Sequence, residues 1–310
     1  MGEHNHSHSH DNNHGSIKNL KIAFILNLSF VVVEVVGGIL TNSVAILSDA
    51  VHDLGDSISL GLAWYLEKSS TKKSNDRFTY GYKRLSILGA LFNALVLLLG
   101  TGFIIYRAIP RLFNPESVQA QGMIILAVIG IVVNGLAVLR VRRGKKLSEQ
   151  VVSLHLLEDL FGWVAVLIVS IVLVFVDVPI LDPILSLLIS IYVLKNVISG
   201  LVKIVRMILQ GVPDGFSVED TKKSILQIDP HIIEVHDLRA WTLDGEENIV
   251  SFHISIEKNM SLQEVVELKR AIKAHLKEQH IEDVTIEVEN IGNCSNNAPT
   301  QISSKNNTNI

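Results

Sequence analysis

Two short stretches share one pattern of ionisable residues, SDAVHDLGDSISL at residues 48–60 and SLHLLEDLFGW at residues 153–163. Side chains four positions apart lie on one face of a helix. Ionisable side chains inside a membrane helix are costly and mark functional positions by default. The stretches therefore predict two membrane helices that each present a histidine–aspartate pair. The pairs are His52 with Asp56 and His155 with Asp159.

The composition around these stretches is that of a membrane protein. Of 310 residues, 48% are hydrophobic and 19% are charged, with a mean hydropathy of +0.37; a large soluble core explains this less well. The net charge of −4 gives no indication of nucleic-acid binding. The single cysteine, Cys294, excludes an internal disulfide framework and a cysteine-rich zinc motif. The polar, histidine-rich start does not resemble a secretory signal peptide.

Six apolar segments approach the ~20 residues that a helix needs to cross a bilayer. Lysine and arginine gather before the first segment and after the second, fourth and sixth, whereas the opposite side carries only Arg107 and Arg111. Because basic residues favour the cytoplasmic side, both termini are predicted to be cytoplasmic. Asp182, followed by Pro183, is expected to cap the sixth segment. The segments are expected at residues 22–40, 44–66, 85–109, 122–139, 151–176 and 180–201.

The pattern changes after Gln210, where VPDG indicates a linker. Beyond it, periodicity predicts helices at 217–227 and 261–277 and strands at 234–241, 248–256 and 283–288. The fold class is therefore an all-α six-helix transmembrane domain plus a small α+β cytoplasmic domain of order α-β-β-α-β. We expect a disordered, histidine-rich tail at 1–17, the six-span membrane domain at 18–210, the cytoplasmic domain at 211–290 and a disordered tail at 291–310.

The two histidine–aspartate pairs have the chemistry of a metal site. Imidazole nitrogen and carboxylate oxygen suit Zn²⁺, which prefers four tetrahedral ligands. Two carboxylates would neutralise the divalent ion, which matters in a medium of low dielectric. A single such pair more often satisfies a neighbouring helix, but two matching pairs favour metal. Neutral imidazole binds metal and protonated imidazole does not, so the same residues predict metal–proton antiport.

Other acidic residues lie beside this pattern, and their roles stay open. Asp49 either orients His52 from behind or faces an outer vestibule. Asp53 and Glu158 are proton carriers or hydrogen-bond partners between helices. Glu34, in the first segment, either lines the path or pairs with another helix.

The N-terminal tract EHNHSHSHDNNH alternates histidine with small polar residues. An expression tag is the alternative, but tags are normally unbroken histidine runs. We favour a flexible, low-affinity metal-capture tract. Its histidines are His4, His6, His8, His10 and His14.

Several longer motifs resemble the cation diffusion facilitator family, in particular the zinc exporters of its cobalt–zinc–cadmium resistance branch. They are GGILTNSVAILSDAVHDLGDSISL, FTYGYKRLSILGALFN, HLLED, LDPILSLLIS, GVPDG and VHDLRAW. The resemblance covers residues ~18–290. It implies a homodimer that exchanges cytoplasmic Zn²⁺ for protons by alternating access, with His52, Asp56, His155 and Asp159 as the transport site. Histidine at the first ligand position is associated there with preference for Zn²⁺ over Cd²⁺.

The same resemblance implies a second, structural or regulatory zinc site in the cytoplasmic domain, with His236, His253 and Glu289 as ligands. The chain departs from the family pattern where Arg84-Leu85-Ser86 replaces Arg-x-Glu and where Arg239-Ala240-Trp241 replaces His-x-Trp. The loop between the fourth and fifth segments is short and basic. This is more typical of bacterial members, so a bacterial inner membrane is the expected location.

Other classes of function fit less well. A zinc protease would need His-Glu-x-x-His, and an ATP-driven pump would need a glycine-rich phosphate loop; the sequence has neither. The chain is therefore not expected to be an enzyme. Efflux of Zn²⁺, with Co²⁺ or Cd²⁺ as further substrates, is the prediction. The alternatives are a Mn²⁺ or Fe²⁺ exporter of the same family, whose site should be richer in carboxylate, and a passive metal channel or membrane zinc sensor.

Overall fold

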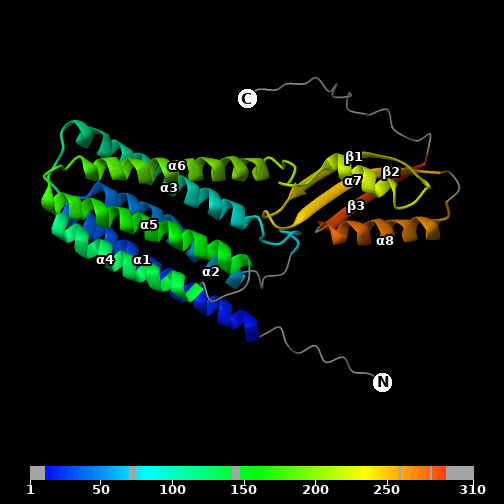
Figure 1. Ribbon diagram of the computed structural model, residues 1–310. Coiled ribbons are helices and arrows are strands. Elements are labelled where there is room, and N and C mark those ends of the chain that lie inside the picture. The colour runs from blue at the N-terminus through cyan, green and yellow to red at the C-terminus, as the bar shows by residue number, and fades with distance from the viewer. Residues whose placement is uncertain (1–10, 70–74, 142–146, 258–259, 280, 291–310) are drawn as a thin grey trace. The chain divides into compact units, whose positions relative to one another are not determined.

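The computed structural model describes residues 11–69, 75–141, 147–257, 260–279 and 281–290 (Figure 1). The chain divides into two compact units, Met1–Ile204 and Val205–Ile310, which are described separately. Four histidines of the predicted capture tract, His4, His6, His8 and His10, lie outside the described residues. His14 falls within the first helix, but its side chain is not among those described.

The first unit is built from long helices. The first begins at Asp11, inside the stretch for which the sequence predicts a disordered tail. The helices are α1 (Asp11–Thr41), α2 (Val44–Ser69), α3 (Leu85–Phe113), α4 (Ala120–Val141), α5 (Leu147–Phe175) and α6 (Leu181–Ile208).

Five of these helices, α1, α3, α4, α5 and α6, are long and apolar enough to cross a membrane. Six spans were expected, and among the described helices of this unit α2 is the one that does not have the composition of a membrane span. It is long enough, but Asp49, Asp53 and Asp56 lie within eight consecutive positions of it. The helix that departs from membrane composition is therefore the one that carries the first histidine–aspartate pair.

Close helix packing in this unit depends on glycine. A Cβ atom on Gly130 of α4 would lie 2.2 Å from the Trp163 ring of α5, so no larger residue fits without a shift. Trp163 is buried together with Ile46 of α2 and Met123 of α4. Small residues that let helices approach are typical of membrane bundles. This packing holds α5 firmly beside α4.

Polar contacts tie together the end of the unit that holds the α1–α2 turn. The Asp182 carboxylate, in the first turn of α6, accepts hydrogen bonds from the Ser43 hydroxyl and from the Val44 N–H at 2.8 Å. Arg111 of α3 donates to the Asn42 carbonyl oxygen at 2.8 Å. We expected Asp182 to cap its own helix; the structure shows that it caps α2 instead.

The second unit is a three-stranded sheet with two helices. Its elements follow the predicted order α-β-β-α-β. The central strand β2 is antiparallel to β1 and parallel to β3. In chain order they are α7 (Val218–Leu226), β1 (Ile232–Thr242), β2 (Asn248–Ile256), α8 (Leu262–Glu278) and β3 (Ile281–Asn290).

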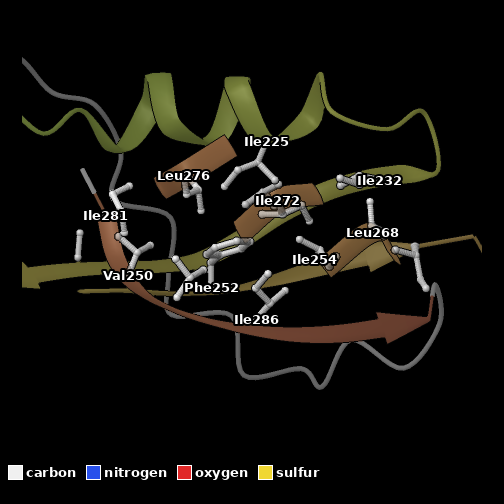
Figure 2. Packing of buried hydrophobic residues seen from close by; sticks show 14 residues of the cluster. Ile225, Ile232, Val250, Phe252, Ile254, Leu268, Ile272, Leu276, Ile281 and Ile286 are labelled. Carbon is white, nitrogen blue, oxygen red and sulfur yellow. The ribbon is translucent and has the colours of Figure 1, made fainter. Parts of the chain in front are cut away.

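Side chains from both helices meet those of the strands in one hydrophobic cluster (Figure 2). Ile272 and Leu276 of α8 are fully buried against it, as is Ile225 of α7. Phe252 and Ile254 of β2 are buried in the same cluster. Because successive residues of a strand point to opposite faces, His253 between them points away from this core.

Candidate metal centre

A group of potential metal ligands links α2 and α5. His52, Asp56 and Asp159 each offer a ligand atom, and these atoms all lie within 4.8 Å of one another. His52 Nε2 is 3.6 Å from Asp159 Oδ1. The Asp159 side chain is only 8% exposed, whereas His52 is partly exposed. An imidazole and two carboxylates at this separation can close around one divalent cation.

The relative register of α2 and α5 follows from two neighbouring contacts. His52 lies beside Asp159, and Asp49 Oδ1 lies 3.5 Å from the position of a Cβ on Gly162. A step of three residues back along α2 thus matches a step of three forward along α5, so the two helices are antiparallel. The fourth predicted ligand, His155, belongs to α5, but its side chain is not among those described.

A cavity of about 240 Å³ adjoins this group. Helix α2 contributes Asp49 and His52 to its lining, and α5 contributes Glu158, Asp159 and Gly162. Helix α6 supplies a mainly apolar wall. The cavity and the ligand group share His52 and Asp159, so an ion between those two residues would border this space.

Three further acidic side chains are buried near this group. Asp49 and Asp53 of α2 are 4% and 5% exposed, and Glu34 of α1 is fully buried. Asn27 of α1 donates to the Asp53 carbonyl oxygen at 3.1 Å and to the Ser57 hydroxyl at 3.0 Å. Glu34 is therefore enclosed by the protein, and α1 and α2 are joined by polar contacts.

The second predicted site lies on the sheet of the second unit. His236 of β1 and His253 of β2 are directly paired across the antiparallel ladder, and their ring centroids are 5.4 Å apart. Glu289 of β3 reaches both, with 2.9 Å from Oε1 to His253 Nδ1 and 3.5 Å from Oε2 to His236 Nε2. Ligand atoms of the three residues lie within 4.8 Å of one another. Two imidazoles and a carboxylate form a donor set typical of zinc.

Two buried atoms of this group lack hydrogen bonds among the described residues. They are His236 Nδ1 and Glu289 Oε2. Unsatisfied buried polar atoms are uncommon in proteins, and a bound ion is one explanation for them. The residues present therefore fit a metal ion.

Sequence reasoning missed Glu287 at this site. Its Oε2 atom lies 3.3 Å from His253 Nε2. Glu287 precedes Glu289 by two positions, so both side chains leave β3 on the same face. That alternation is visible in the sequence and could have identified Glu287.

A β-bulge lies directly beside His236. The register of β1 against β2 shifts between His236 and Arg239, and Asp237 has a φ of 52°. Aspartate tolerates this left-handed conformation better than most residues. Bulges occur often next to functional sites, where they re-aim a side chain. Here the bulge begins directly after His236, one of the three candidate ligands.

Comparison with protein families agrees with both units. Residues 20–209 match the family described as the cation efflux transmembrane domain, and residues 213–291 match the cation efflux protein cytoplasmic domain. The chain belongs to the cation efflux family. The resemblance seen in the sequence motifs is thus confirmed, and the protein is a membrane transporter rather than an enzyme.

Several named relatives are similar over most of their length. The cadmium, cobalt and zinc/H(+)-K(+) antiporter of Bacillus subtilis (strain 168) is 33% identical over 294 residues, which are 93% of this chain and 94% of the relative. Zinc transporter ZitB of Pectobacterium atrosepticum is 34% identical, covering 92% and 88%. The metal cation efflux system protein CzcD of Cupriavidus metallidurans is 32% identical, covering 86% and 85%.

A solved structure is also similar to part of the chain. It is the metal-bound C-terminal domain of the CzcD transporter from Thermotoga maritima, which is 28% identical with a TM-score of 0.23. The match covers 24% of this chain and 90% of that domain.

Proposed function

We propose that this cation efflux protein exports Zn²⁺ from the cytoplasm in exchange for protons, by alternating access to one site between α2 and α5. Co²⁺ and Cd²⁺ are the proposed further substrates. The observation that carries the proposal is the meeting of His52, Asp56 and Asp159 inside the helical unit. The names of the relatives, which include zinc, cadmium and cobalt transporters, support the class of substrate.

His155 is proposed as the fourth ligand because of the antiparallel register. His52 lies beside Asp159, so a step of four residues forward along α2 reaches Asp56, and the matching step back along α5 reaches His155. Both steps are about one helical turn. The two pairs would then form a four-sided donor set of two histidines and two aspartates, which suits tetrahedral Zn²⁺.

Proton exchange is proposed from the chemistry of the same donors. Imidazole must be neutral to bind a metal ion, and protonation of the donors competes with the ion. A site that opens to each side of the membrane in turn can load Zn²⁺ on one side and protons on the other. One relative is named as an antiporter that uses protons, which supports this coupling.

The proposed topology has six spans, with α2 as the sixth membrane helix despite its three aspartates. An acidic helix can lie in a membrane when its acids face the interior of a bundle, and Asp49 and Asp53 are indeed buried. Both termini are proposed to be cytoplasmic and the membrane to be a bacterial inner membrane. The N-terminal histidine tract is proposed as a capture segment for cytoplasmic metal.

The second unit is proposed to hold a structural or regulatory zinc ion and to join two chains as a homodimer. His236, His253 and Glu289 would hold the ion, and Glu287 is close enough to assist. The match to the cation efflux cytoplasmic domain supports this assignment.

Transport in inverted membrane vesicles tests the main proposal. Wild-type vesicles should accumulate Zn²⁺ when their interior is acidic and should stop when the pH gradient is collapsed. The rate of Zn²⁺ uptake should be at least roughly tenfold lower in the Asp159→Asn variant, because mutation of residues that only support a metal ligand already lowers metal affinity or activity by about 10–100-fold. Asp177→Asn is the matched control, since Asp177 is an exposed residue outside the helices.

Each other result has a definite meaning. Uptake that continues without a pH gradient and follows the membrane voltage would indicate a channel. Binding without movement of the ion would indicate a sensor. Preference for Mn²⁺ over Zn²⁺ in a comparison of Zn²⁺, Cd²⁺, Co²⁺ and Mn²⁺ would contradict the proposed substrate.

A further inference from the structure

Asp49 is a buried carboxylate that the proposed ligand set does not use. Its residue is 4% exposed, and its Oδ2 atom makes no hydrogen bond among the described residues. The side chain lines the same cavity as His52 and Asp159. A buried carboxylate is costly in a membrane unless a proton or a cation neutralises it, so this carboxyl group is suited to take up a cation.

The opposite wall of the cavity leaves room at Asp49. Gly162 of α5 also lines the cavity, and a Cβ at that position would lie 3.5 Å from Asp49 Oδ1. A methyl group there would make an ordinary contact, but a larger side chain would reach into the space at the carboxylate. Helix α5 therefore presents open space to Asp49.

Asp49 lies three residues before His52, which is about 4.5 Å along the axis of α2. Asp56 lies on the other side of His52, so the two carboxylates flank the histidine along the helix. Zn²⁺–oxygen bonds are about 2.0–2.2 Å long. A cation that moves from the His52–Asp159 pair toward the α2 N-terminus would therefore move toward Asp49, which lines the same cavity.

Polar groups continue beyond Asp49 in the same direction. The Ser48 and Ser190 hydroxyls are 3.1 Å apart and join α2 to α6. Ser186, one turn nearer the start of α6, is fully buried, and its hydroxyl makes no hydrogen bond among the described residues. The interface of α2 with α6 thus carries polar groups between the cavity and the end where Asp182 lies.

We propose that Asp49 forms a second binding position for the transported divalent cation, on the α2 N-terminal side of the main site. The inference rests on the proposed transport function and adds a step to it. The cation passes from His52 and Asp159 to Asp49 as it moves between the main site and the membrane face at the α1–α2 turn. Asp49 is therefore a ligand of a passing ion and not a support for the His52 ring.

Zinc binding and zinc flux in the same full-length protein separate these roles. Purified wild type and variants would be reconstituted in liposomes that contain a zinc-sensitive dye, and equilibrium binding of Zn²⁺ would be measured on the same preparations. The Asp49→Asn variant, which keeps the side-chain volume, should bind Zn²⁺ within about threefold of wild type while its turnover falls roughly tenfold or more, the pattern of an interaction used during turnover and not in the resting state.

Gly162→Val gives a second, independent variant because it fills the space at Asp49 without removing a charge. It should also retain binding and lose turnover. Gly135→Val is its control, since a Cβ on Gly135 of α4 meets nothing within 4 Å. That control should transport at the wild-type rate.

Two results would overturn the inference. Wild-type turnover in Asp49→Asn or in Gly162→Val would show that no ion needs this position. Loss of binding in Asp49→Asn as severe as in Asp159→Asn would show that Asp49 serves the main site. If Asp159→Asn itself bound and transported normally, the proposed function would fail instead, and the two failures are therefore distinguishable.

Discussion

The buried side chain of Glu34 lowers the free energy of unfolding of this protein. It is fully buried in α1, and neither of its carboxyl oxygens has a hydrogen-bond donor among the described residues. The carboxyl group of Asp53 on α2 is a neighbour of Glu34. A hydrogen bond between two carboxyl groups requires that one of them carry a proton.

Replacing Glu34 with glutamine should therefore stabilise the protein. The amide N–H₂ group can donate to Asp53, and an unsatisfied buried polar group costs about 1–3 kcal/mol. Thermal unfolding in detergent, followed by gel filtration, should show a midpoint raised by roughly 2–4 °C. A lower midpoint for Glu34→Gln would mean that the carboxyl group makes a contact that an amide cannot replace.

His231 and Asp229, in the second unit, form a pair whose pKa values shift in opposite directions. The hydrogen bond that the His231 ring donates to the Asp229 carboxylate raises the pKa of His231, and the hydrogen bond that the His231 backbone N–H donates lowers the pKa of Asp229. Because the pKa of His231 is raised, its contribution to stability is fully present below the unfolded-state pKa of about 6.5. That contribution is lost as the pH rises through the folded-state pKa. Because the pKa of Asp229 is lowered, its contribution to stability is present above the unfolded-state pKa of about 3.9. That contribution is lost as the pH falls through the folded-state pKa. The pair should thus contribute most between these limits.

Histidine ring NMR on the full-length protein can test this pair. In Asp229→Asn, the pKa of His231 should fall toward its ordinary value. An unaltered His231 titration would contradict the assigned cause.

The capping of α2 by Asp182 is an interaction between elements. Its carboxylate accepts hydrogen bonds from Ser43, Val44 and Ala45 at the start of α2, although it belongs to α6. Asp182→Ala should destabilise the protein by roughly 2–4 kcal/mol, since it leaves buried N–H groups unsatisfied. Asp182→Asn should cost less, because the amide oxygen still accepts. Thermal midpoints should rank wild type, Asn and Ala in that order, and Asp177→Ala should match wild type.

The contact of α4 with α5 gives a second prediction at this scale. Gly130→Ala would place a methyl group against the Trp163 ring, where a Cβ would lie at 2.2 Å. Overpacking of this kind typically costs about 1–3 kcal/mol. Gly135→Ala, on the same helix with open space around it, should be neutral or stabilising because alanine favours helix. Equal thermal midpoints for the two variants would refute the packing argument.

Sequence periodicity predicted those elements whose pattern is local. The periodicity of residues 261–277 predicted α8, and Leu268, Ile272 and Leu276, which are four apart and share a helix face, form its buried side. The spacing of His52 and Asp56 likewise placed both on one side of α2. Contacts between elements could not be read in this way. The register of α2 against α5, and the choice of α2 as the partner of Asp182, depend on packing between segments more than a hundred residues apart.

At the scale of the whole molecule, the two ligand groups predict two separable classes of bound zinc. Asp159→Asn and His253→Ala should each remove about one Zn²⁺ per chain, and the double variant should remove both, because sites that share no ligand in separate units act independently. Metal analysis of the purified protein after dialysis measures this directly. His231→Gln is the control for a surface histidine. A loss of both ions from either single variant would show that the sites are not independent.

The tie between Asp182 and the first residues of α2 also limits how the helical unit can move. That end of α2 cannot separate from α6 unless buried, charge-assisted hydrogen bonds break. A change of conformation that keeps them intact must swing α2 about this fixed point, so displacement grows with distance along the helix. Asp56 would then travel further than Asp49 in each cycle, and the gate that opens widest would lie toward Ser69.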